Sequence, residues 1–167
     1  MDIEETVKKA SIFETLNDEE VEKVLNITRE IRFHEGEFIM QEGDQGDTLY
    51  MVVQGDVGVS KSLTMKFGED DFRKTEKVLT RFSPEDHAIF GEMALIGQDS
   101  RSATIIARTD CVLLEIKRDD FIRLIEGNPE LGVKILMNLS GLLISRLRHS
   151  SQDIIRLTTA LSIALSR

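Results

Sequence analysis

The stretch FGEMALIGQDSRSAT, residues 90–104, connects two segments of β type. The run KVLTRF at residues 77–82 precedes it and ends at a Ser83-Pro84 turn, and the run SATIIA, which begins at Ser102, has the β-branched composition of a further strand. Within the connection, GEMALI is expected to form a short helical turn. Free N–H groups at the beginning of a helical turn bind anions, so the stretch predicts an anion site between two strands.

Three residues of the stretch give this site its chemistry. Gly91 lets the chain turn sharply. Arg101 presents five N–H donors in a planar fork that suits a phosphate. Glu92 supplies a carboxylate, the group that accepts hydrogen bonds from ribose hydroxyls in dinucleotide-binding folds. These residues predict a site for a phosphorylated sugar, and the alternative on these residues alone is a structural ion pair between Glu92 and Arg101.

The β-type pattern extends over residues 30–117. Short runs rich in Val, Ile, Thr, Phe and Tyr alternate with Gly and Asp turn signals, which indicates antiparallel strands. Strands are predicted at TLYMVV (48–53), DVGVSKS (56–62), KVLTRF (77–82), SATIIA (102–107) and CVLLEI (111–116). Such closely spaced turns favour a small barrel or jelly roll, with turn or close-approach roles for Gly36, Gly43, Gly46 and Gly55.

A helical part precedes the strands, over residues 1–29. Asn17 as N-cap and Glu20 three residues later form a capping-box signal. A helix is therefore predicted over residues 18–27.

A second helical part follows the strands, over residues 118–167. The run DDFIRLIEG, residues 119–127, predicts a helix that ends at a glycine cap, Gly127. Asn128 as N-cap and Pro129 as first residue then begin a last helix that continues nearly to the end of the sequence.

The last helix carries an apolar stripe along its length. Alternating three- and four-residue steps, typical of a two-helix seam, relate Leu136, Ser140, Leu143, Leu147, Ser150, Ile154, Leu157, Leu161 and Ala164. We expect the first half of the helix to pack on its own barrel and the second half to pack on a partner helix in a homodimer, because a two-fold axis lets one stripe pair with itself. The alternative is that the whole stripe packs on the chain's own barrel.

Composition argues against several functional classes. The 167 residues, 41% of them hydrophobic, suffice for a single domain with one core. Twenty-one Lys and Arg against thirty Asp and Glu give a net charge of −9, which opposes nucleic-acid binding. The charged N-terminus and the interrupted C-terminal apolar runs predict neither a signal peptide nor a membrane span. Cys111, the single cysteine, is expected to be buried and reduced, which fits a cytoplasmic protein.

The sequence lacks the common patterns of catalysis and metal binding. Its histidines, His34, His87 and His149, have no metal-site spacing such as H-E-x-x-H, and no G-K-[ST] phosphate loop occurs. We therefore predict neither an enzyme nor a metal site.

The order and spacing of residues 90–104 resemble the phosphate-binding cassette of the cyclic-nucleotide-binding domain family, F-G-E-[LIM]-[AG]-L, a short loop, then R-[AST]-A. Residues 34–59 also resemble the family's first strands, and FIRLIEGNPEL, residues 121–131, resembles its helix B entry. The effector domains of bacterial catabolite activators and of kinase regulatory subunits belong to this family. The resemblance implies a mainly β fold with flanking helices: a cupin-like β jelly-roll barrel with N-terminal helices and a long C-terminal helix.

Carried over by position, the resemblance implies ligand contacts from Gly91, Glu92, Met93, Ala94, Arg101 and Ser102. Glu92 would accept a hydrogen bond from the ribose 2′-hydroxyl, and the two residues after it would offer backbone N–H groups. Arg101 would neutralise the cyclic phosphate, and Ser102 would add a hydroxyl and an N–H group to it.

A segment of the last helix extends the resemblance. SRLRHSSQDI, residues 145–154, is similar to the part of the dimer helix of the bacterial catabolite activator that reaches the purine. This similarity implies base contacts from Ser150 and Ser151, in the same subunit or in its neighbour, and places Arg146 near the phosphate.

The sequence departs from the family at two points. Ser100 stands where kinase regulatory subunits usually have proline, so we expect a less rigid loop before Arg101. Bacterial regulators of this type continue into a helix-turn-helix domain, which this sequence lacks, so we expect no binding to DNA.

The predicted function is a regulatory sensor for a cyclic purine nucleotide. Cyclic AMP is favoured because hydroxyls on the last helix can meet the adenine amino group, and cyclic GMP remains open because Ser102 could meet a syn guanine. The nucleotide would close the helix over the base, and the dimer seam would transmit the change to an unidentified protein partner. The alternatives are a degenerate dimerisation or docking module of the same fold, or a sensor for another phosphorylated or carboxylated effector.

Overall fold

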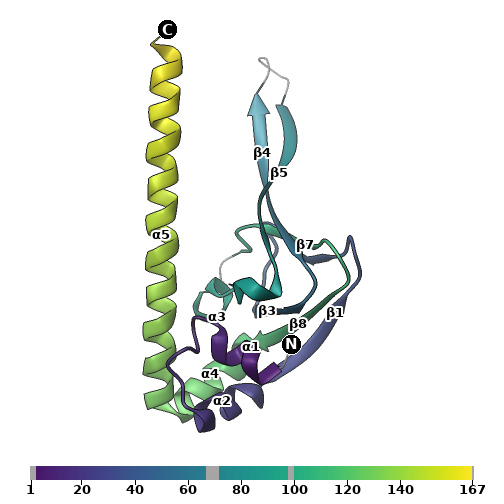
Figure 1. Ribbon diagram of the computed structural model, residues 1–167, viewed down its shortest axis with the longest axis vertical. Helices are drawn as coiled ribbons and strands as arrows, with labels where there is room; N and C mark the ends of the chain where they lie inside the picture. Colours follow the sequence, from purple (N-terminus) through teal and green to yellow (C-terminus); the bar gives the residue numbers. More distant parts are fainter. Residues whose placement is uncertain (1–2, 67–71, 98–99, 167) are drawn as a thin grey trace.

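The β-rich segment folds into two four-stranded antiparallel sheets, which the computed structural model of the chain shows together with flanking helices (Figure 1). The structure describes residues 3–66, 72–97 and 100–166. The strand order is β1-β8-β3-β6 in the first sheet and β2-β7-β4-β5 in the second. The strands are Thr28–Phe33 (β1), Phe38–Met40 (β2), Thr48–Gln54 (β3), Val57–Lys66 (β4), Phe72–Phe82 (β5), Ile89–Phe90 (β6), Thr104–Ala107 (β7) and Cys111–Lys117 (β8).

Helices precede, interrupt and follow these strands. Their bounds are Ile3–Lys9 (α1), Asp18–Leu25 (α2), Met93–Ile96 (α3), Arg118–Gly127 (α4) and Pro129–Leu165 (α5), with a 3-10 turn at Pro84–Asp86 (η1). This arrangement confirms the predicted jelly roll with N-terminal helices and a long C-terminal helix.

Strand β3 lies at the centre of the core because both of its faces are covered. Residues 48–53 of this strand are all buried. Tyr50 and Val52 belong to the apolar layer between the two sheets. Leu49 and Met51 point the other way, toward the helices. The first sheet therefore separates the inside of the roll from the helical layer.

The five predicted strands are all present. Strand β5 begins at Phe72, earlier than predicted, because it pairs with β4 from Lys66 opposite Phe72 to Val57 opposite Phe82.

The turn and close-approach roles predicted for the glycines are also confirmed. Gly36, Gly43 and Gly55 have φ angles of 86°, 91° and 81°, and Gly46 instead allows a close approach of the Arg101 side chain.

Cys111 is buried between the two sheets, as predicted, with 2% of its surface exposed. Its Sγ lies 3.3 Å from the carbonyl oxygen of Asp56 and 3.2 Å from that of Thr109. Burial raises the pKa of the Cys111 thiol, which disfavours the thiolate form that a nucleophile requires.

Helix α2 begins at the predicted capping box. The Asn17 Oδ1 accepts a hydrogen bond from the Glu20 N–H, and a Glu20 carboxylate oxygen accepts one from the Asn17 N–H, each at 2.9 Å. The helix ends at Leu25, two residues before the predicted end. Strand β1 begins directly afterwards, where the Thr28 hydroxyl donates to the Val24 carbonyl at 2.8 Å.

Removal of the cap by Asn17→Ala is expected to lower the free energy of unfolding by about 1 kcal/mol, because one N–H of the first helical turn loses its acceptor. For a chain of this size the melting temperature should fall by roughly 2–4 °C. Thermal unfolding followed by circular dichroism measures this change. The matched variant Asn26→Ala, at the other end of α2, should shift the melting temperature by less than half as much, and equal shifts would contradict the capping role.

The junction between α4 and α5 differs from the prediction. Gly127 is the last residue of α4, and it has no positive φ, so the predicted glycine cap is wrong. The Asn128 Nδ2 instead donates to the Leu124 carbonyl at 3.0 Å, which satisfies the end of α4. Asn128 does precede α5 and Pro129 is its first residue, but the Asn128 side chain makes no cap bond to α5 because it is already engaged.

Helix α5 consists of a packed half and an exposed half. Leu131, Ile135 and Leu139 are buried against the roll and the N-terminal helices. The first half therefore packs as expected, although through these residues and not through the seam position Leu136, which is exposed. Residues 143–166 are exposed throughout, and Figure 1 shows this part of α5 extending past the body of the roll, where only strands β4 and β5 project in the same direction. In the described part of the chain, no helix combines the length and hydropathy that a membrane crossing requires.

Polar contacts connect the packed half of α5 to helix α2 and to the turn that precedes it. The Lys134 ammonium lies 2.7 Å from Glu20 Oε1. The Asn138 Nδ2 donates to the Ile12 carbonyl at 3.2 Å and to the Thr15 hydroxyl at 2.9 Å. The capping box of α2 and the first half of α5 therefore share Glu20.

The Glu20–Lys134 pair makes part of the stability depend on pH. The Lys134 ammonium and the Asn17 N–H lower the pKa of Glu20 below its usual value. Because the folded pKa is the lower one, the stabilisation is complete above the unfolded value of about 4.3 and is lost as the pH falls through the folded value. Lys134→Gln should therefore lower the melting temperature most at pH 6–7, and the difference from wild type should shrink below about pH 4. A difference that is constant with pH would contradict the ion pair.

Candidate functional site

A turn at Gly91 positions the first part of the site. Strand β6 ends at Phe90, and Gly91 has a φ of 78°, which favours glycine. A Cβ atom at Gly91 would lie 2.5 Å from the carbonyl oxygen of Thr48 and 2.7 Å from Nη1 of Arg101. The turn therefore brings the beginning of α3 against both β3 and Arg101. The Ala94 N–H donates to the Gly91 carbonyl at 3.1 Å and closes this turn.

Arg101 is the buried cation of the site. Its residue surface is 8% exposed, and Nη1 donates to the Thr48 carbonyl at 2.8 Å. Its Cζ lies 5.9 Å from the centroid of the Tyr50 ring, and burial raises the pKa of the Tyr50 hydroxyl, so the ring below the cation is neutral. Among the residues that the structure describes, Arg101 forms no ion pair. The Glu92–Arg101 pair considered from sequence is thus absent, and the guanidinium keeps donors for a ligand.

The loop at residues 43–46 holds Arg101 in place through the backbone. The Arg101 N–H donates to the Asp44 carbonyl at 2.8 Å, and the Gly43 N–H donates to the Arg101 carbonyl at 2.9 Å. Gln45 forms an isolated β-bridge with Ser100. A Cβ atom at Gly46 would lie 2.0 Å from Arg101 Nε, so any larger residue here would have to displace the Arg101 guanidinium.

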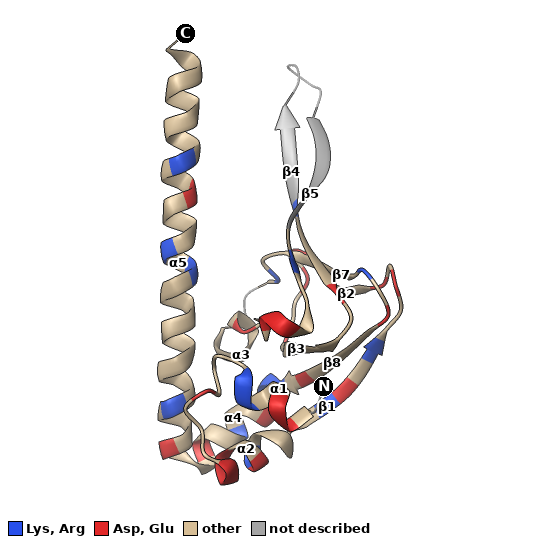
Figure 2. Ribbon diagram, in the orientation of Figure 1, with Lys and Arg blue, Asp and Glu red and all other residues tan. Residues whose placement is uncertain are grey.

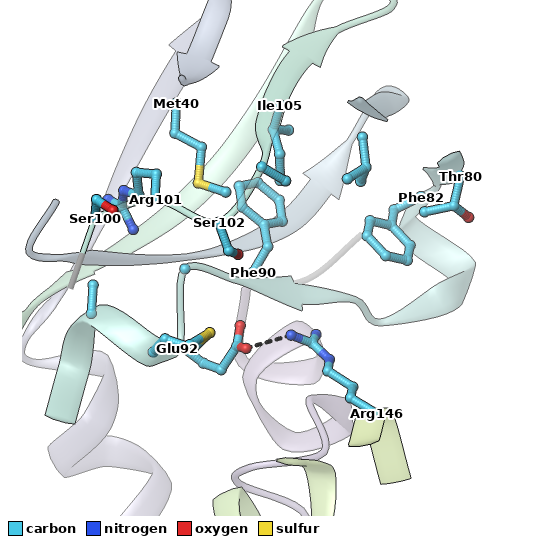
Figure 3. A pocket seen from close by; sticks show the side chains of 15 residues that line it. Met40, Thr80, Phe82, Phe90, Glu92, Ser100, Arg101, Ser102, Ile105 and Arg146 are labelled. Carbon is cyan, nitrogen blue, oxygen red and sulfur yellow. Dashed lines mark hydrogen bonds and ion pairs between the residues drawn. The ribbon is translucent and has the colours of Figure 1, made fainter. Parts of the chain in front are cut away.

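Glu92 pairs with a residue from the long helix. Its side chain is 5% exposed, and Oε1 lies 2.5 Å from Nη1 of Arg146. The Arg146 Nη2 also donates to the Ile89 carbonyl at 2.8 Å. Arg146 therefore contacts the residue expected to bind the ribose, and it crosses from α5 to the roll (Figure 3).

One pocket collects most of the residues selected from sequence. Its lining includes Gly91, Glu92, Met93, Ala94, Arg101, Ser102 and Arg146. Figure 3 shows Arg101 and Ser100 at one end of the pocket, Phe82 and Thr80 at the other, and the Glu92–Arg146 pair along one side. Residues 98 and 99 of the predicted cassette lie outside the described residues.

The structure does not bring Ser150 and Ser151 into this pocket. Ser150 lines a larger neighbouring groove between α5 and β5, which shares Thr80, Phe82 and Arg146 with the pocket. Ser151 lines neither, and its hydroxyl donates to the Leu147 carbonyl at 2.9 Å within α5. The two serines therefore point in different directions from the same helix.

Sequence reasoning missed the apolar side of the pocket. It is lined by Met40, Val59, Phe82, Phe90 and Ile105, and the polar residue Thr80 lies beside them. Thr80 and Phe82 are two residues apart on β5, which places them on one face of the strand. Val59 of β4 lies opposite Thr80 in the β4–β5 pairing. The strand pattern contained part of this signal, but the pairing of β4 with β5 was needed to place these residues together.

The described residues, 3–66, 72–97 and 100–166, contain no group of three or more His, Cys, Asp or Glu side chains that could hold a metal ion. The arrangement of the pocket instead suits an organic anion. Two guanidinium groups and one carboxylate line it, so its local charge is positive in a chain of net charge −9. An apolar surface at the opposite end from Arg101 can cover an aromatic base.

Comparison with known proteins is consistent with this geometry. Residues 30–128 match the family described as Cyclic nucleotide-binding domain. The Cyclic AMP receptor protein of Thermus thermophilus is 31% identical over 148 residues, which are 89% of this chain and 62% of that protein. The cAMP-dependent protein kinase regulatory subunit of Dictyostelium discoideum is 33% identical over 123 residues, 72% of this chain and 35% of that protein. The chain thus spans less than two thirds of the length of either relative.

Solved structures show the same fold. The Thermus thermophilus Catabolite Activator Protein superposes with a TM-score of 0.73 and 30% identity, over 89% of this chain and 63% of that one. A cyclic nucleotide-binding domain from Methylobacillus flagellatus gives a TM-score of 0.74 and 28% identity, over 92% of this chain and 80% of that one.

Proposed function

Because the chain belongs to the cyclic nucleotide-binding domain family, we propose that it binds a cyclic purine nucleotide, cyclic AMP first, as a regulatory sensor. One observation carries the proposal: the buried Arg101 has no carboxylate partner among the described residues, and it lines the same pocket as Glu92. A buried cation with free donors is costly unless an anion binds it. Two relatives whose names refer to cyclic AMP support the choice of ligand.

We assign the cyclic phosphate to Arg101 and Ser102. A charge-assisted hydrogen bond contributes about 1.5–3 kcal/mol, whereas micromolar affinity requires roughly 8 kcal/mol. Arg101 is therefore insufficient alone. The hydroxyl of Ser102, the backbone at Met93 and the ribose contact at Glu92 would contribute the remainder, together with burial of the base against Phe82 and Val59.

We assign the helix α5 to the signal. The groove beside the pocket, with Ser150 in its wall, is where the base of a nucleotide held at Arg101 would meet α5. Closure of the helix over the base would shift the position of its exposed half. Since Ser151 faces away from its own roll, we assign it to the ligand of a neighbouring subunit, and Ser150 to the ligand of its own.

The exposed half of α5 supports a homodimer. Leu147, Ile154 and Leu161 are 68%, 60% and 59% exposed, and they lie on one stripe. Figure 2 shows basic residues along this half of the helix, where Arg146, Arg148 and Arg156 accompany a single acidic residue, Asp153.

Sedimentation equilibrium of Leu147→Glu should show monomers where wild type is dimeric. Gln152→Glu, on the other side of the helix, should remain dimeric.

Isothermal titration calorimetry with cyclic AMP, cyclic GMP and 5′-AMP tests the sensor function. We expect micromolar binding of the cyclic nucleotides, tighter for cyclic AMP, and much weaker binding of 5′-AMP. No heat with either cyclic nucleotide in a folded protein would contradict the proposal and favour a docking module of the same fold. Competition of cyclic AMP with another phosphorylated compound that binds more tightly would instead favour a different effector.

A further inference from the structure

The end of α5, residues 154–165, is a strongly apolar part of the helix that we call the distal segment. It contains a single charged residue, Arg156. Its six large apolar residues are each at least 59% exposed: Ile154, Ile155, Leu157, Leu161, Ile163 and Leu165. Figure 1 shows this end of α5 on the far side of the molecule from α2 and α4. The chain's own roll therefore does not cover the distal segment.

The apolar residues of the distal segment lie on all sides of the helix. Successive helical residues are about 100° apart, so Ile155 lies about 100° from Ile154, and Ile163 lies about 180° from it. Ile154 belongs to the stripe predicted as a two-helix seam, and one partner helix covers mainly that stripe. A homodimer would therefore leave Ile155 and Ile163 in water. A helix that is apolar all round is normally buried all round.

The polar groups of the distal segment are compatible with burial. The hydroxyls of Thr158 and Thr159 donate to carbonyl oxygens one turn earlier in α5, each at 2.8 Å. They can therefore be buried without the loss of a hydrogen bond. The Arg156 Nη1 lies 3.5 Å from Asp153 Oδ1, so the one charge of the segment has a partner on its own helix.

The positions beside the predicted seam change in character where the distal segment begins. Two-stranded coiled coils usually carry charged residues at these positions. Arg146 and Asp153 hold them before the distal segment, whereas Thr158, Ala160 and Leu165 hold them within it. Uncharged flanks widen the surface that can be buried, so further helices can pack beside the seam.

Further copies of the same segment match this surface better than a lipid bilayer does. They supply apolar side chains over the same length, and the paired Arg156 does not oppose the contact. An apolar run of 12 residues is too short to span a bilayer. A helix that lies in the membrane interface keeps a strongly polar or basic face, whereas Ile155 and Ile163 place apolar side chains away from the seam.

We propose that the distal segments of two homodimers pack against each other as an antiparallel four-helix bundle, which makes the protein a tetramer. Such a dimer of dimers has closed dihedral symmetry, so it does not grow into a filament. Antiparallel packing places the rolls at opposite ends and separates Arg146 and Arg148 of one dimer from those of the other. The inference uses the homodimer proposed above and does not depend on the nucleotide.

Sedimentation equilibrium of the full chain tests the bundle. As the concentration rises from about 2 to about 200 μM, wild type should change from the mass of a dimer to that of a tetramer. Ile163→Glu places a charge in the bundle but outside the dimer seam, so it should raise the dissociation constant of the tetramer by at least about 100-fold and remain a dimer. Its helix content by circular dichroism should equal that of wild type, because glutamate favours helices.

Gln152→Glu provides the matched control. It adds the same charge before the distal segment, on a side of α5 that lies only about 20° from that of Ile163. This variant should form tetramers as wild type does. Small-angle scattering tests the orientation, because antiparallel packing should lengthen the maximum dimension of the dimer by at least about half. A tetramer no longer than the dimer would overturn the antiparallel arrangement.

Three other results would overturn the inference. Wild type could remain a dimer at the highest concentration, or Ile163→Glu could associate as wild type does. The third is flotation of wild type, but not of Ile163→Glu, with vesicles of phosphatidylcholine and phosphatidylglycerol, which would assign the distal segment to a lipid surface. A monomeric wild type would overturn the homodimer and the bundle together.

Calorimetry separates the bundle from the sensor function. Ile163 lines neither the pocket nor the neighbouring groove, so Ile163→Glu should bind cyclic AMP as wild type does. Absence of cyclic AMP binding in a tetrameric wild type would overturn the proposed sensor function and support the bundle.

Discussion

Replacement of Arg101 by glutamine is expected to weaken cyclic AMP binding by about 100-fold or more. The guanidinium would make two charge-assisted hydrogen bonds to the cyclic phosphate, each contributing about 1.5–3 kcal/mol, and a loss of 2.7 kcal/mol corresponds to about 100-fold in Kd. The effect should be large because Arg101 is buried, so water screens its charge little. Calorimetric titration of wild type and variant measures it.

Two further variants separate the phosphate contact from effects on folding. Arg101→Lys keeps the charge but loses the planar fork and the contact to the Thr48 carbonyl, so it should bind with intermediate affinity. Arg29 is exposed and lies on β1 in the first sheet, so the control variant Arg29→Gln should bind cyclic AMP as wild type does. A loss of less than about fivefold in a folded Arg101→Gln protein would place the phosphate elsewhere.

Burial explains why two of the predicted strands, β3 and β8, have the clearest sequence signal. TLYMVV and CVLLEI consist mostly of apolar residues because β3 is buried along residues 48–53 and β8 is buried or half-buried along residues 111–116. Strand β1, TREIRF, was not recognised, because charged residues occupy its exposed positions and only its pairing with β8 makes it a strand. Strand β6 has two residues, too few for any pattern.

The site could be predicted where it depends on local spacing and not where it depends on packing. Gly91, Glu92 and Arg101 lie on one connection, so their order along the chain sufficed to place them together. Arg146 was predicted near the phosphate; the structure shows that its guanidinium pairs with Glu92 in the same pocket as Arg101, and its place relative to a phosphate stays a prediction. Its direction follows from the packing of α5, because Arg146 is seven residues after the buried Leu139 and so faces the roll.

Substitution of Gly91 by alanine is expected to lower both stability and affinity. A Cβ atom at this position would lie 2.5 Å from a backbone oxygen of β3, and the φ of 78° is unfavourable for alanine. The strained turn and the shift of β3 should together lower the free energy of unfolding by about 2–4 kcal/mol. This change corresponds to a decrease of roughly 5–15 °C in the melting temperature. Thermal unfolding by calorimetry measures it.

The same change should weaken cyclic AMP binding by more than about tenfold, because the new methyl group would also lie 2.7 Å from Nη1 of Arg101 and displace the guanidinium. Gly141→Ala provides the matched control. Gly141 lies on the exposed side of α5, and apart from the backbone of its own helix and its chain neighbours no atom lies within 4 Å of an added Cβ, so alanine there should raise stability by up to about 1 kcal/mol. A loss of stability in Gly91→Ala and a gain in Gly141→Ala would separate the geometry of the turn from any general effect of alanine. A Gly91→Ala protein that melts and binds cyclic AMP like wild type would instead show that the connection can move away from Thr48 without disturbing the site.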